Sequence, residues 1–573
     1  SNNTAVGSQA LLSNTTGSGN VAVGYLALDG TTTGGTNTAI GQFALTDNTT
    51  GASNTAVGSG ALGDNTTADN NTAVGVNALR LNSTGTLNTA VGQGALDANT
   101  TGGSNTAMGN NALGVQQTAS DNTAFGKSAL SDNTTGAEQV AVGSIALDAN
   151  TTGSVNTAIG YGALTDNTTG SSNTAVGKTA LGDNTTADNN TAIGRDALRL
   201  NTTGANNVAV GGFALDANTS ASNNTAVGTS CMGANTTGDN NVAVGASALA
   251  ANTTASENTA IGRFAMQDNT TGTRNVAVGA IALDANTTAS DNTACGYQTL
   301  SSNTTGVDNT AFGSGALVFN TTADNNTALG SAALDANTTG NHNTAVGREA
   351  LGANTTGTVN TAVGKDALKV NTSGIANNAF GGQALISCTT GQYNSAIGND
   401  SGKDLTTGSN NMFFGHDAGR SNSPSGSITT GSNNVVLGNN STTDLFCADT
   451  SISSSDSRDK TDITSFNIGL DWINALRPVT YRWDRRTWYG TEEQPYGTPD
   501  GSKKRDRLHI GFLAQEALEV EKANGYGDTN DNMLVCNLTE DGMSYGMKYE
   551  RLVPILVNAI KELSAKVTAL EAG

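Results

Sequence analysis

The sequence predicts a mostly β protein, a parallel β-roll or β-helix solenoid of 17-residue coils, followed by a small α+β domain that ends in a coiled-coil helix. Three observations support this prediction. The motif NTAVG recurs with a 17-residue period, as at residues 54–58 and 71–75. Residues 1–454 are poor in charge, whereas residues 455–573 are rich in it. Residues 552–573 carry apolar side chains at alternating spacings of three and four, which is the seam of a coiled coil.

The repeat holds its phase without insertion. Its first Asn is Asn3, and the 17-residue period leads from there to Asn411, which gives 25 copies in which only Gln139 replaces the Asn. A Gly follows at the fourth position after this Asn in every copy, and a second column contains Leu11 and Leu28. Such strict phasing is typical of a solenoid, because each coil must lie on the preceding coil.

The local sequence indicates how one coil is built. TAV is a short β run that ends in a Gly, AL begins a second short run, and NTTG and DNN are turn sequences. We therefore expect two short strands per coil, stacked in parallel at a rise of roughly 4.8 Å. The Val/Ile and Leu columns are predicted to form the interior.

The alanine in the middle of the motif then points to the outer face of its strand. A face kept at Ala over so many coils suggests that another copy of the chain packs closely against it. We expect a homotrimer around a shared axis, which would also cover strand edges. The predicted trimer seam includes Ala56, Ala73 and Ala90.

The repeat is interrupted after Asn411. The next motif Asn is Asn434, whereas the regular period would place it at position 428, and the insertion contains Pro424. Aromatic residues and a histidine gather here, at Phe413, Phe414, His416 and Phe446. They predict an end cap, a ligand-binding tip, or both. Residues 1–427 are thus the predicted shaft, and residues 428–454 the cap and a linker.

Five further elements are expected near the C-terminus. Residues 468–476 form an amphipathic helix that ends before Pro478, residues 479–483 form a strand, and residues 508–520 form a strand that runs into a helix. Residues 552–573 form a helix that we expect to join a trimeric coiled coil. Its seam residues are Val553, Leu556, Ile560, Leu563, Val567 and Leu570.

The motifs NTAVG and NTAIG are similar to the head repeats of trimeric autotransporter adhesins, the YadA-like β-roll. This resemblance covers about residues 1–440 and implies a left-handed roll. The 17-residue period is longer than that of the adhesin coils.

Residues 455–573 resemble the peptidase S74 domain, the intramolecular chaperone at the C-terminus of phage endosialidases, tail fibres and tail spikes. The segment SDSRDK at 455–460 matches the Ser-Asp-x-Arg-x-Lys start of that domain. The segments IGLDWINALRPVTYRWD and HIGFLAQE and the terminal helix follow in the family order. The chaperone domain is thus predicted over residues 455–551.

The resemblance implies self-cleavage between Ser454 and Ser455. The hydroxyl of Ser455 would attack the carbonyl that precedes it, with Lys460 as the base and His509 as an orienting group or oxyanion donor. This single-turnover Ser/Lys reaction is the one catalytic activity expected, with no activity on external substrates. Without the resemblance, the same residues fit a solvated linker.

The favoured function is a structural fibre shaft of a tailed phage, which is trimerised by a self-cleaving chaperone and involved in host attachment. The expected location is the virion tail fibre. The expected partners are further copies of the chain, a host receptor (a glycan or an outer-membrane component) and other tail proteins. The alternatives are a bacterial surface adhesin or filament, a glycan-degrading tail spike and an ice-binding solenoid.

Composition argues against other classes. The net charge of −21 and the lack of a basic segment disfavour nucleic acid as a partner. No apolar run predicts membrane insertion, and no motif predicts a metal or a cofactor. The five cysteines have no CxxC spacing. Cys231, Cys295 and Cys388 stand in repeat columns, where we interpret them as small substitutes in packed positions.

Overall fold

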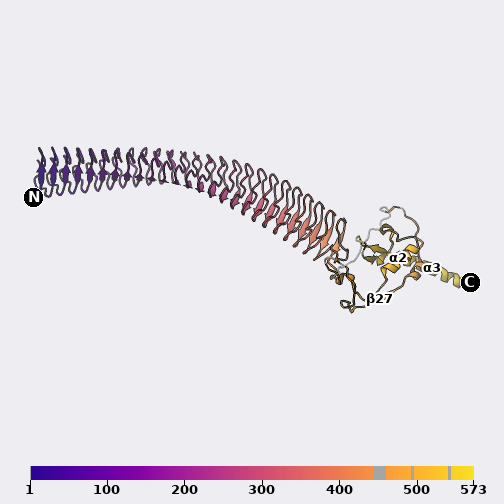
Figure 1. The fold of residues 1–573 in the computed structure, drawn as a ribbon. Coiled ribbons are helices and arrows are strands. Elements are labelled where there is room, and N and C mark those ends of the chain that lie inside the picture. The colour runs from indigo at the N-terminus through magenta and orange to yellow at the C-terminus, as the bar shows by residue number, and fades with distance from the viewer. Residues whose placement is uncertain are drawn as a thin grey trace. The chain divides into compact units, whose positions relative to one another are not determined.

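The fold is described from a computed structural model. It covers residues 2–443, 460–461, 463–491, 494, 496–539, 542 and 544–573. Contacts divide the chain into two compact units, residues 1–326 and 327–573, which are described separately. Figure 1 shows one short strand in each coil and the mixed α and β elements near the C-terminus.

The first unit is a parallel solenoid with three residues in each strand. Its strands are β1 Thr4–Val6, β2 Val21–Val23, β3 Thr38–Ile40, β4 Thr55–Val57, β5 Thr72–Val74, β6 Thr89–Val91, β7 Thr106–Met108, β8 Thr123–Phe125, β9 Val140–Val142, β10 Thr157–Ile159, β11 Thr174–Val176, β12 Thr191–Ile193, β13 Val208–Val210, β14 Thr225–Val227, β15 Val242–Val244, β16 Thr259–Ile261, β17 Val276–Val278, β18 Thr293–Cys295 and β19 Thr310–Phe312. Residue i of one strand pairs with residue i+17 of the next, as Ala56 does with Ala73. The predicted 17-residue parallel coil is confirmed.

The second unit continues the same pattern. Its strands are β20 Thr327–Leu329, β21 Thr344–Val346, β22 Thr361–Val363, β23 Asn378–Phe380, β24 Ser395–Ile397, β25 Met412–Phe414 and β26 Val435–Leu437. The last two strands, β25 and β26, pair in parallel although the chain between them is longer than in the other coils, so the insertion lies outside the ladder.

The predicted second strand of each coil is wrong. The segment at Ala61 and Leu62 forms a turn, and Leu62 has a φ of 51°. A left-handed conformation is accessible to Leu at moderate cost but is an outlier for β-branched residues. From Leu11 to Leu385 the column contains Leu and Met, whereas the half-buried turn position two residues earlier also takes β-branched residues with positive φ, such as Ile145 at 53°.

The prediction of which strand face lies inside is also wrong. Ala56, Ala61 and Leu62 are fully buried, whereas Val57 points outward and is half-buried. Side chains alternate along a strand, and the turn brings Leu62 to the alanine side, where the narrow interior leaves room for a methyl group. Ala56, Ala73 and Ala90 are therefore core residues of a single chain and cannot form the trimer seam.

Two asparagine ladders complete the interior. The side-chain oxygen of Asn37 accepts a hydrogen bond from the backbone amide of Asn54 at 2.9 Å, and the side chain of Asn54 donates to the carbonyl of Ala68 at 2.8 Å. In the second ladder, Asn65 donates to the side-chain oxygen of Asn48 at 2.9 Å. Buried amides stabilise the fold only when they are paired, and each coil supplies the partner for the next.

The last coils replace an alanine of the core by Phe413. The leucine column ends at Gly402, and a side chain at Gly402 or Gly419 would occupy the space that the Phe413 ring fills. Phe413 is fully buried, so the prediction that it contacts a ligand at an exposed tip is wrong. It restores core volume where the leucine side chain is missing.

The C-terminal region of the second unit is α+β. Its elements are α1 Leu470–Ala475, β27 Val479–Tyr481, η2 Arg486–Trp488, β28 His509–Gly511, α2 Ala514–Ala523, η3 Asn530–Asn532, β29 Cys536–Leu538, β30 Tyr545–Met547, η4 Tyr549–Arg551 and α3 Leu552–Ala572. The pairs β27–β28 and β29–β30 are both antiparallel. The predicted helices and strands here are confirmed. The buried core is Trp472, Leu476, Ala517, Leu518, Val535, Cys536, Leu552 and Ile555.

Helix α3 has two different halves. Its first half buries Leu552, Ile555 and Ala559, and Glu562 accepts a hydrogen bond from the backbone amide of Leu470 at 2.8 Å. The predicted seam residues are all exposed, from 42% at Leu556 to 82% at Leu570. In the described part of the chain, no helix is both long and apolar enough to cross a membrane.

Candidate functional site

The predicted cleavage site is only partly described. Ser454 and Ser455 lie outside the described residues, as does Phe446 of the predicted tip. Lys460, the predicted base, is described and exposed in the single chain. A lysine serves as a base near neutral pH only when burial or a neighbouring cation lowers its pKa.

His509 lies at the start of β28, directly opposite Tyr481 of β27. The two rings are stacked with centroids 5.6 Å apart, and the Trp483 ring meets His509 edge-on at 6.3 Å. This packing holds the imidazole in one orientation while leaving it half-buried. Burial raises the pKa of Tyr481. The structure does not place His509 relative to Ser455, which lies outside the described residues.

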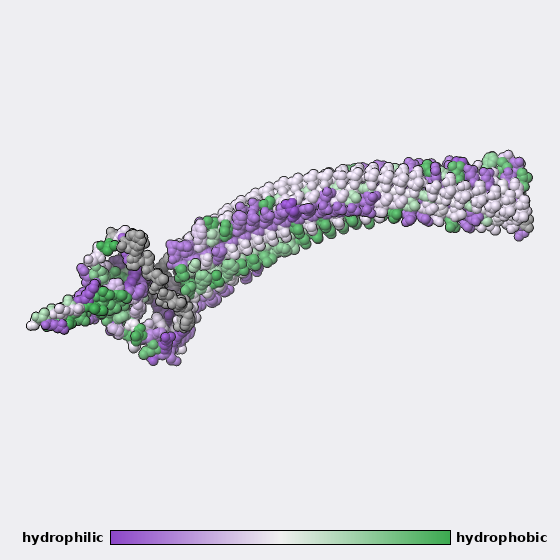
Figure 2. Space-filling model, turned by 180° about the vertical axis from the view of Figure 1, so that it is seen from behind, coloured by the Kyte–Doolittle hydropathy of each residue, from purple (hydrophilic) through white to green (hydrophobic). Residues whose placement is uncertain are grey.

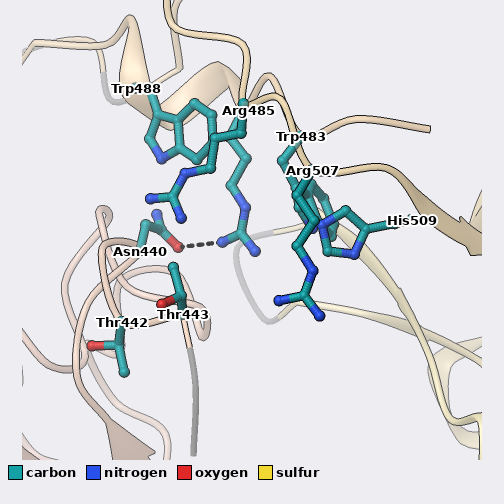
Figure 3. A pocket seen from close by; sticks show the side chains of 9 residues that line it. Asn440, Thr442, Thr443, Trp483, Arg485, Trp488, Arg507 and His509 are labelled. Carbon is teal, nitrogen blue, oxygen red and sulfur yellow. Dashed lines mark hydrogen bonds between the residues drawn. The ribbon is translucent and has the colours of Figure 1, made fainter.

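A cluster of arginine and aromatic side chains adjoins His509. The Arg485 guanidinium lies 4.4 Å from the Trp483 ring centre, and that of Arg505 lies 5.0 Å from the Trp488 ring. With Arg507 they line a pocket of about 270 Å³, which Asn440, Thr442 and Thr443 also line (Figure 3).

Arg485 is the most constrained member of this cluster. It donates to the side-chain oxygen of Asn440 at 3.3 Å. Burial, together with the nearby charge of Arg505, lowers the pKa of Arg485. Cation–π contacts of this kind favour fixed guanidinium positions and a positive surface. This cluster was not predicted, although the Trp and Arg residues between positions 483 and 507 are a visible signal for it in the sequence.

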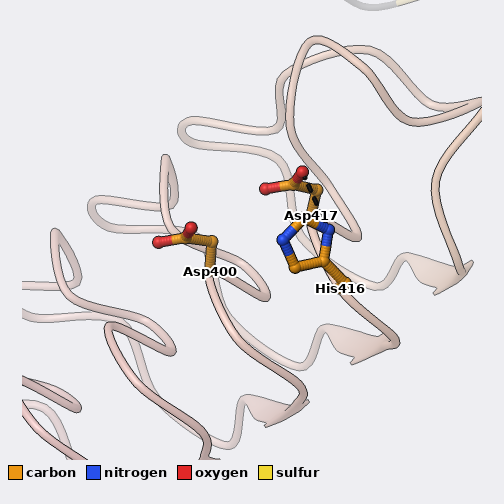
Figure 4. Close-up of side chains that lie close together, drawn as sticks. All are labelled: Asp400, His416 and Asp417. Carbon is orange, nitrogen blue, oxygen red and sulfur yellow. Dashed lines mark ion pairs between the residues drawn. The ribbon is translucent and has the colours of Figure 1, made fainter.

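A second cluster lies where the regular solenoid ends, at Asp400, His416 and Asp417 (Figure 4). Their ligand atoms lie within 4.8 Å of one another. Arg420 already contacts both carboxylates, at 2.6 Å from Asp417 and 3.8 Å from Asp400. Asn422 also donates to Asp417 at 2.8 Å. Lys403 also pairs with Asp400 at 3.1 Å, so Arg420 and Lys403 supply one positive charge for each carboxylate, and the group is an ion-pair network that ties the last coils together.

Of the other predicted tip residues, Phe414 is 36% exposed in the outward row of strand side chains, and His416 is exposed and lies 3.0 Å from Asp417. Since Phe413 is buried, the described residues contain no continuous aromatic surface at this position.

The comparisons with known proteins concern this C-terminal region. Residues 455–526 match the peptidase S74 family model, described as the chaperone of endosialidase. We call this range the chaperone segment. It includes Lys460, His509 and the arginine–aromatic cluster. The search of curated proteins and the search of solved structures gave no match.

The chaperone segment does not contain its whole core. It supplies α1, β27, β28 and α2, whereas Val535, Leu552 and Ile555 come from residues that follow it. The folded domain therefore extends into α3. A parallel β-solenoid joined to a chaperone segment is consistent with the architecture of a phage tail fibre.

Proposed function

We propose that this chain is the shaft of a phage tail fibre, that three copies assemble, and that the chaperone segment directs assembly and then cuts itself from the shaft. The match over residues 455–526 carries this proposal. The exposed seam of α3 supports it, because six apolar side chains spaced as a coiled coil remain uncovered in a single chain.

The shaft gives the chaperone a physical task. Its coils are nearly identical, so copies that associate one or more coils out of step would still make many favourable contacts. Association of α3 at one end fixes the alignment before the long repeat pairs. The 21 residues of α3 offer about three heptads for this purpose.

Cleavage would follow assembly. The Ser455 hydroxyl attacks the carbonyl carbon of Ser454, the new C–O bond forms as the C–N bond breaks, and Lys460 carries the hydroxyl proton to the departing amine. Water then hydrolyses the ester. Lys460 is exposed in the single chain, so burial by neighbouring copies would supply the low pKa that this base needs. His509 would orient the site or donate to the oxyanion.

The shaft is further proposed to contact the host surface, with a glycan or an outer-membrane component as receptor. Its outward turns carry Asn, Thr, Ser and Asp in variable positions. Other tail proteins would hold the fibre on the virion.

Expression of the full chain tests this function. The wild type is expected to release residues 455–573 as a separate band on a denaturing gel, and to show the mass of three shafts in light scattering. Ser455→Ala and Lys460→Ala should stay uncut but trimeric, whereas the matched control Ser457→Ala should cut normally. An uncut, monomeric wild-type chain would contradict the proposal.

A further inference from the structure

The outer face of the solenoid sheet carries a continuous apolar row. The third residue of each strand points outward, and in the first unit it is apolar in every coil. We call this row the outward column: Val6, Val23, Ile40, Val57, Val74, Val91, Met108, Phe125, Val142, Ile159, Val176, Ile193, Val210, Val227, Val244, Ile261, Val278, Cys295 and Phe312. Figure 2 shows a hydrophobic band beside hydrophilic surface along the part of the solenoid nearer the C-terminal region.

Much of the outward column is uncovered. Eleven of its members expose between 36% and 57% of their surface, with Val74 and Val244 at the lower value and Val6 at the upper. Single exposed apolar residues are ordinary, but an unbroken row of this length is rare on a monomer and marks an interface.

The distance between successive side chains of the outward column indicates what kind of partner fits it. Strands stack in register, so successive members lie one strand spacing apart, roughly 4.8 Å. A partner must present apolar groups at that same spacing over 19 coils, and a second copy of this chain does so. The row offers on the order of 1,000 Å² per chain, which exceeds the roughly 800 Å² per partner that a stable interface needs.

The outward column also contains features that distinguish one alignment from another. Phe125 and Phe312 are larger than their Val and Ile neighbours in the column, and Met108 precedes Phe125 by one coil. Parallel copies in register place like residues together, whereas a shift by one coil sets a large ring against a smaller side chain. Such mismatches leave voids or overlaps that cost free energy.

We propose that copies of this chain pack on one another through the outward column, in parallel and in register. This rests on the self-association proposed above and assigns it to a definite face of the shaft. The outward column takes the place of the alanine column as the proposed contact between copies, because the alanine column is buried inside each chain.

The outward column contains one cysteine, Cys295, whose thiol can report by cross-linking whether two copies pack on this face. Of the cysteines that the structure describes, Cys231, Cys388 and Cys536 are buried and Cys295 is not. In-register packing brings the Cys295 side chains of neighbouring copies together, within reach of a disulfide. Oxidation would join two thiols as a disulfide, with two electrons and two protons passing to the added oxidant.

The experiment oxidises the full chain with copper phenanthroline in a Cys447→Ser background, which removes the cysteine outside the described residues. A covalent dimer that reductant reverses is expected on a denaturing gel, with up to two of every three chains linked in a trimer. Cys295→Val, which installs the usual residue of the column, should abolish it.

A matched control places the thiol on another face of the same coil. Thr305 is exposed, and Cys295→Val/Thr305→Cys should give no dimer above the Cys295→Val background. Equal cross-linking at the two positions would overturn the proposal, as would absence of a Cys295 dimer in an assembly of three chains. The latter result would leave the cleavage and assembly of the proposed function intact, whereas a monomeric chain would contradict both.

Discussion

The backbone amide of Val535 donates a hydrogen bond of 2.7 Å to the fully buried carboxylate of Glu521. The amides of Leu534 and Cys536 donate to the same carboxylate at 2.9 and 2.8 Å. One side chain of α2 thereby satisfies three donors at the start of β29. A buried carboxylate is tolerated only with such partners, and its removal leaves the amides unpaired.

Glu521→Ala is therefore expected to destabilise the C-terminal domain by about 3 kcal/mol. Glu521→Gln keeps one acceptor oxygen and should cost less. Thermal unfolding of the full chain, followed through the tryptophan signal, measures both. Glu519→Ala is the matched control, because that side chain is exposed and forms an ion pair with Lys522 on the surface of the same helix. Equal midpoints for Glu521→Ala and Glu519→Ala would refute this role.

The conformation of the leucine column gives a second prediction. Leu164 is fully buried with a φ of 52°. Leu164→Ile keeps the side-chain volume but moves a branch to Cβ in a fully buried site, where, unlike the half-buried Ile145 with its φ of 53°, the side chain cannot shift toward solvent. This should cost about 1.5 kcal/mol. Leu164→Met should be nearly neutral, since Met232 and Met266 occupy the same column with φ near 50°. Denaturant midpoints of the shaft compare the two, and a shaft as stable with Ile as with Met would contradict the explanation.

The glycine that ends each NTAVG motif gives a third prediction. Gly160 has a φ of 139°, and a Cβ there would run into the backbone carbonyl of Gly177 in the next coil. Gly160→Ala is expected to separate the two coils and to expose their amides to hydrogen exchange. Gly162→Asn is the control, because its φ of 62° suits Asn and Asn77 stands in the same column. Protection that is unchanged by Gly160→Ala would count against the close stacking.

The solenoid is also expected to respond to pH. Burial raises the pKa of Asp148 from 3.8, and the charges of Asp132 and Asp166 in adjacent coils raise it further. The pKa values of Asp64, Asp183, Asp216, Asp284 and Asp335 are likewise raised, first by burial.

A raised pKa in the folded state means that folding favours the protonated form. The free energy of unfolding should therefore increase as the pH falls through the raised pKa values of the folded state. This added stability is fully present below the ordinary pKa of 3.8, and it is lost as the pH rises through the folded-state values. Asp291 and Asp417, whose pKa values are lowered, oppose this trend. Melting of the shaft across this range should show a higher midpoint at the acidic end. Asp148→Asn should reduce the slope, and a midpoint that falls on acidification would disprove the assignment.

The 17-residue repeat could be predicted from the sequence, but the face of each strand that points into the core could not. The columns of Asn54 and Leu62 recur at one fixed period, which specifies a stacked coil. The alternation of Ala56 and Val57 defines two strand faces without saying which one is buried. That choice depends on the left-handed turn at Leu62, and a leucine carries no local signal for this conformation.

The C-terminal site shows a similar limit. The elements α1, β27, β28, α2 and α3 follow from apolar spacing and from Pro478, and each is found near its predicted position, whereas β29 and β30 were not predicted. The Trp and Arg residues are visible in the sequence, but the contact of Arg505 with Trp488 could not be foreseen, because it joins segments on the two sides of a polar loop. The backbone amide of Arg505 donates to the carbonyl of Trp483 at 2.9 Å, and this bond and the antiparallel pairing of β27 with β28 bring the two segments together.

The last prediction concerns α3. Ile560 and Leu563 are 65% and 50% exposed, on the half of the helix beyond Ala559. Ile560→Asp should leave the buried core of the domain intact yet prevent assembly, because three charges would meet in the seam. If assembly creates the environment that Lys460 needs, the same substitution abolishes cleavage at Ser455. Light scattering and a denaturing gel read the two effects, with the exposed Lys561→Ala as control. A trimeric Ile560→Asp chain would exclude this seam, and a monomeric but fully cleaved one would separate cleavage from assembly.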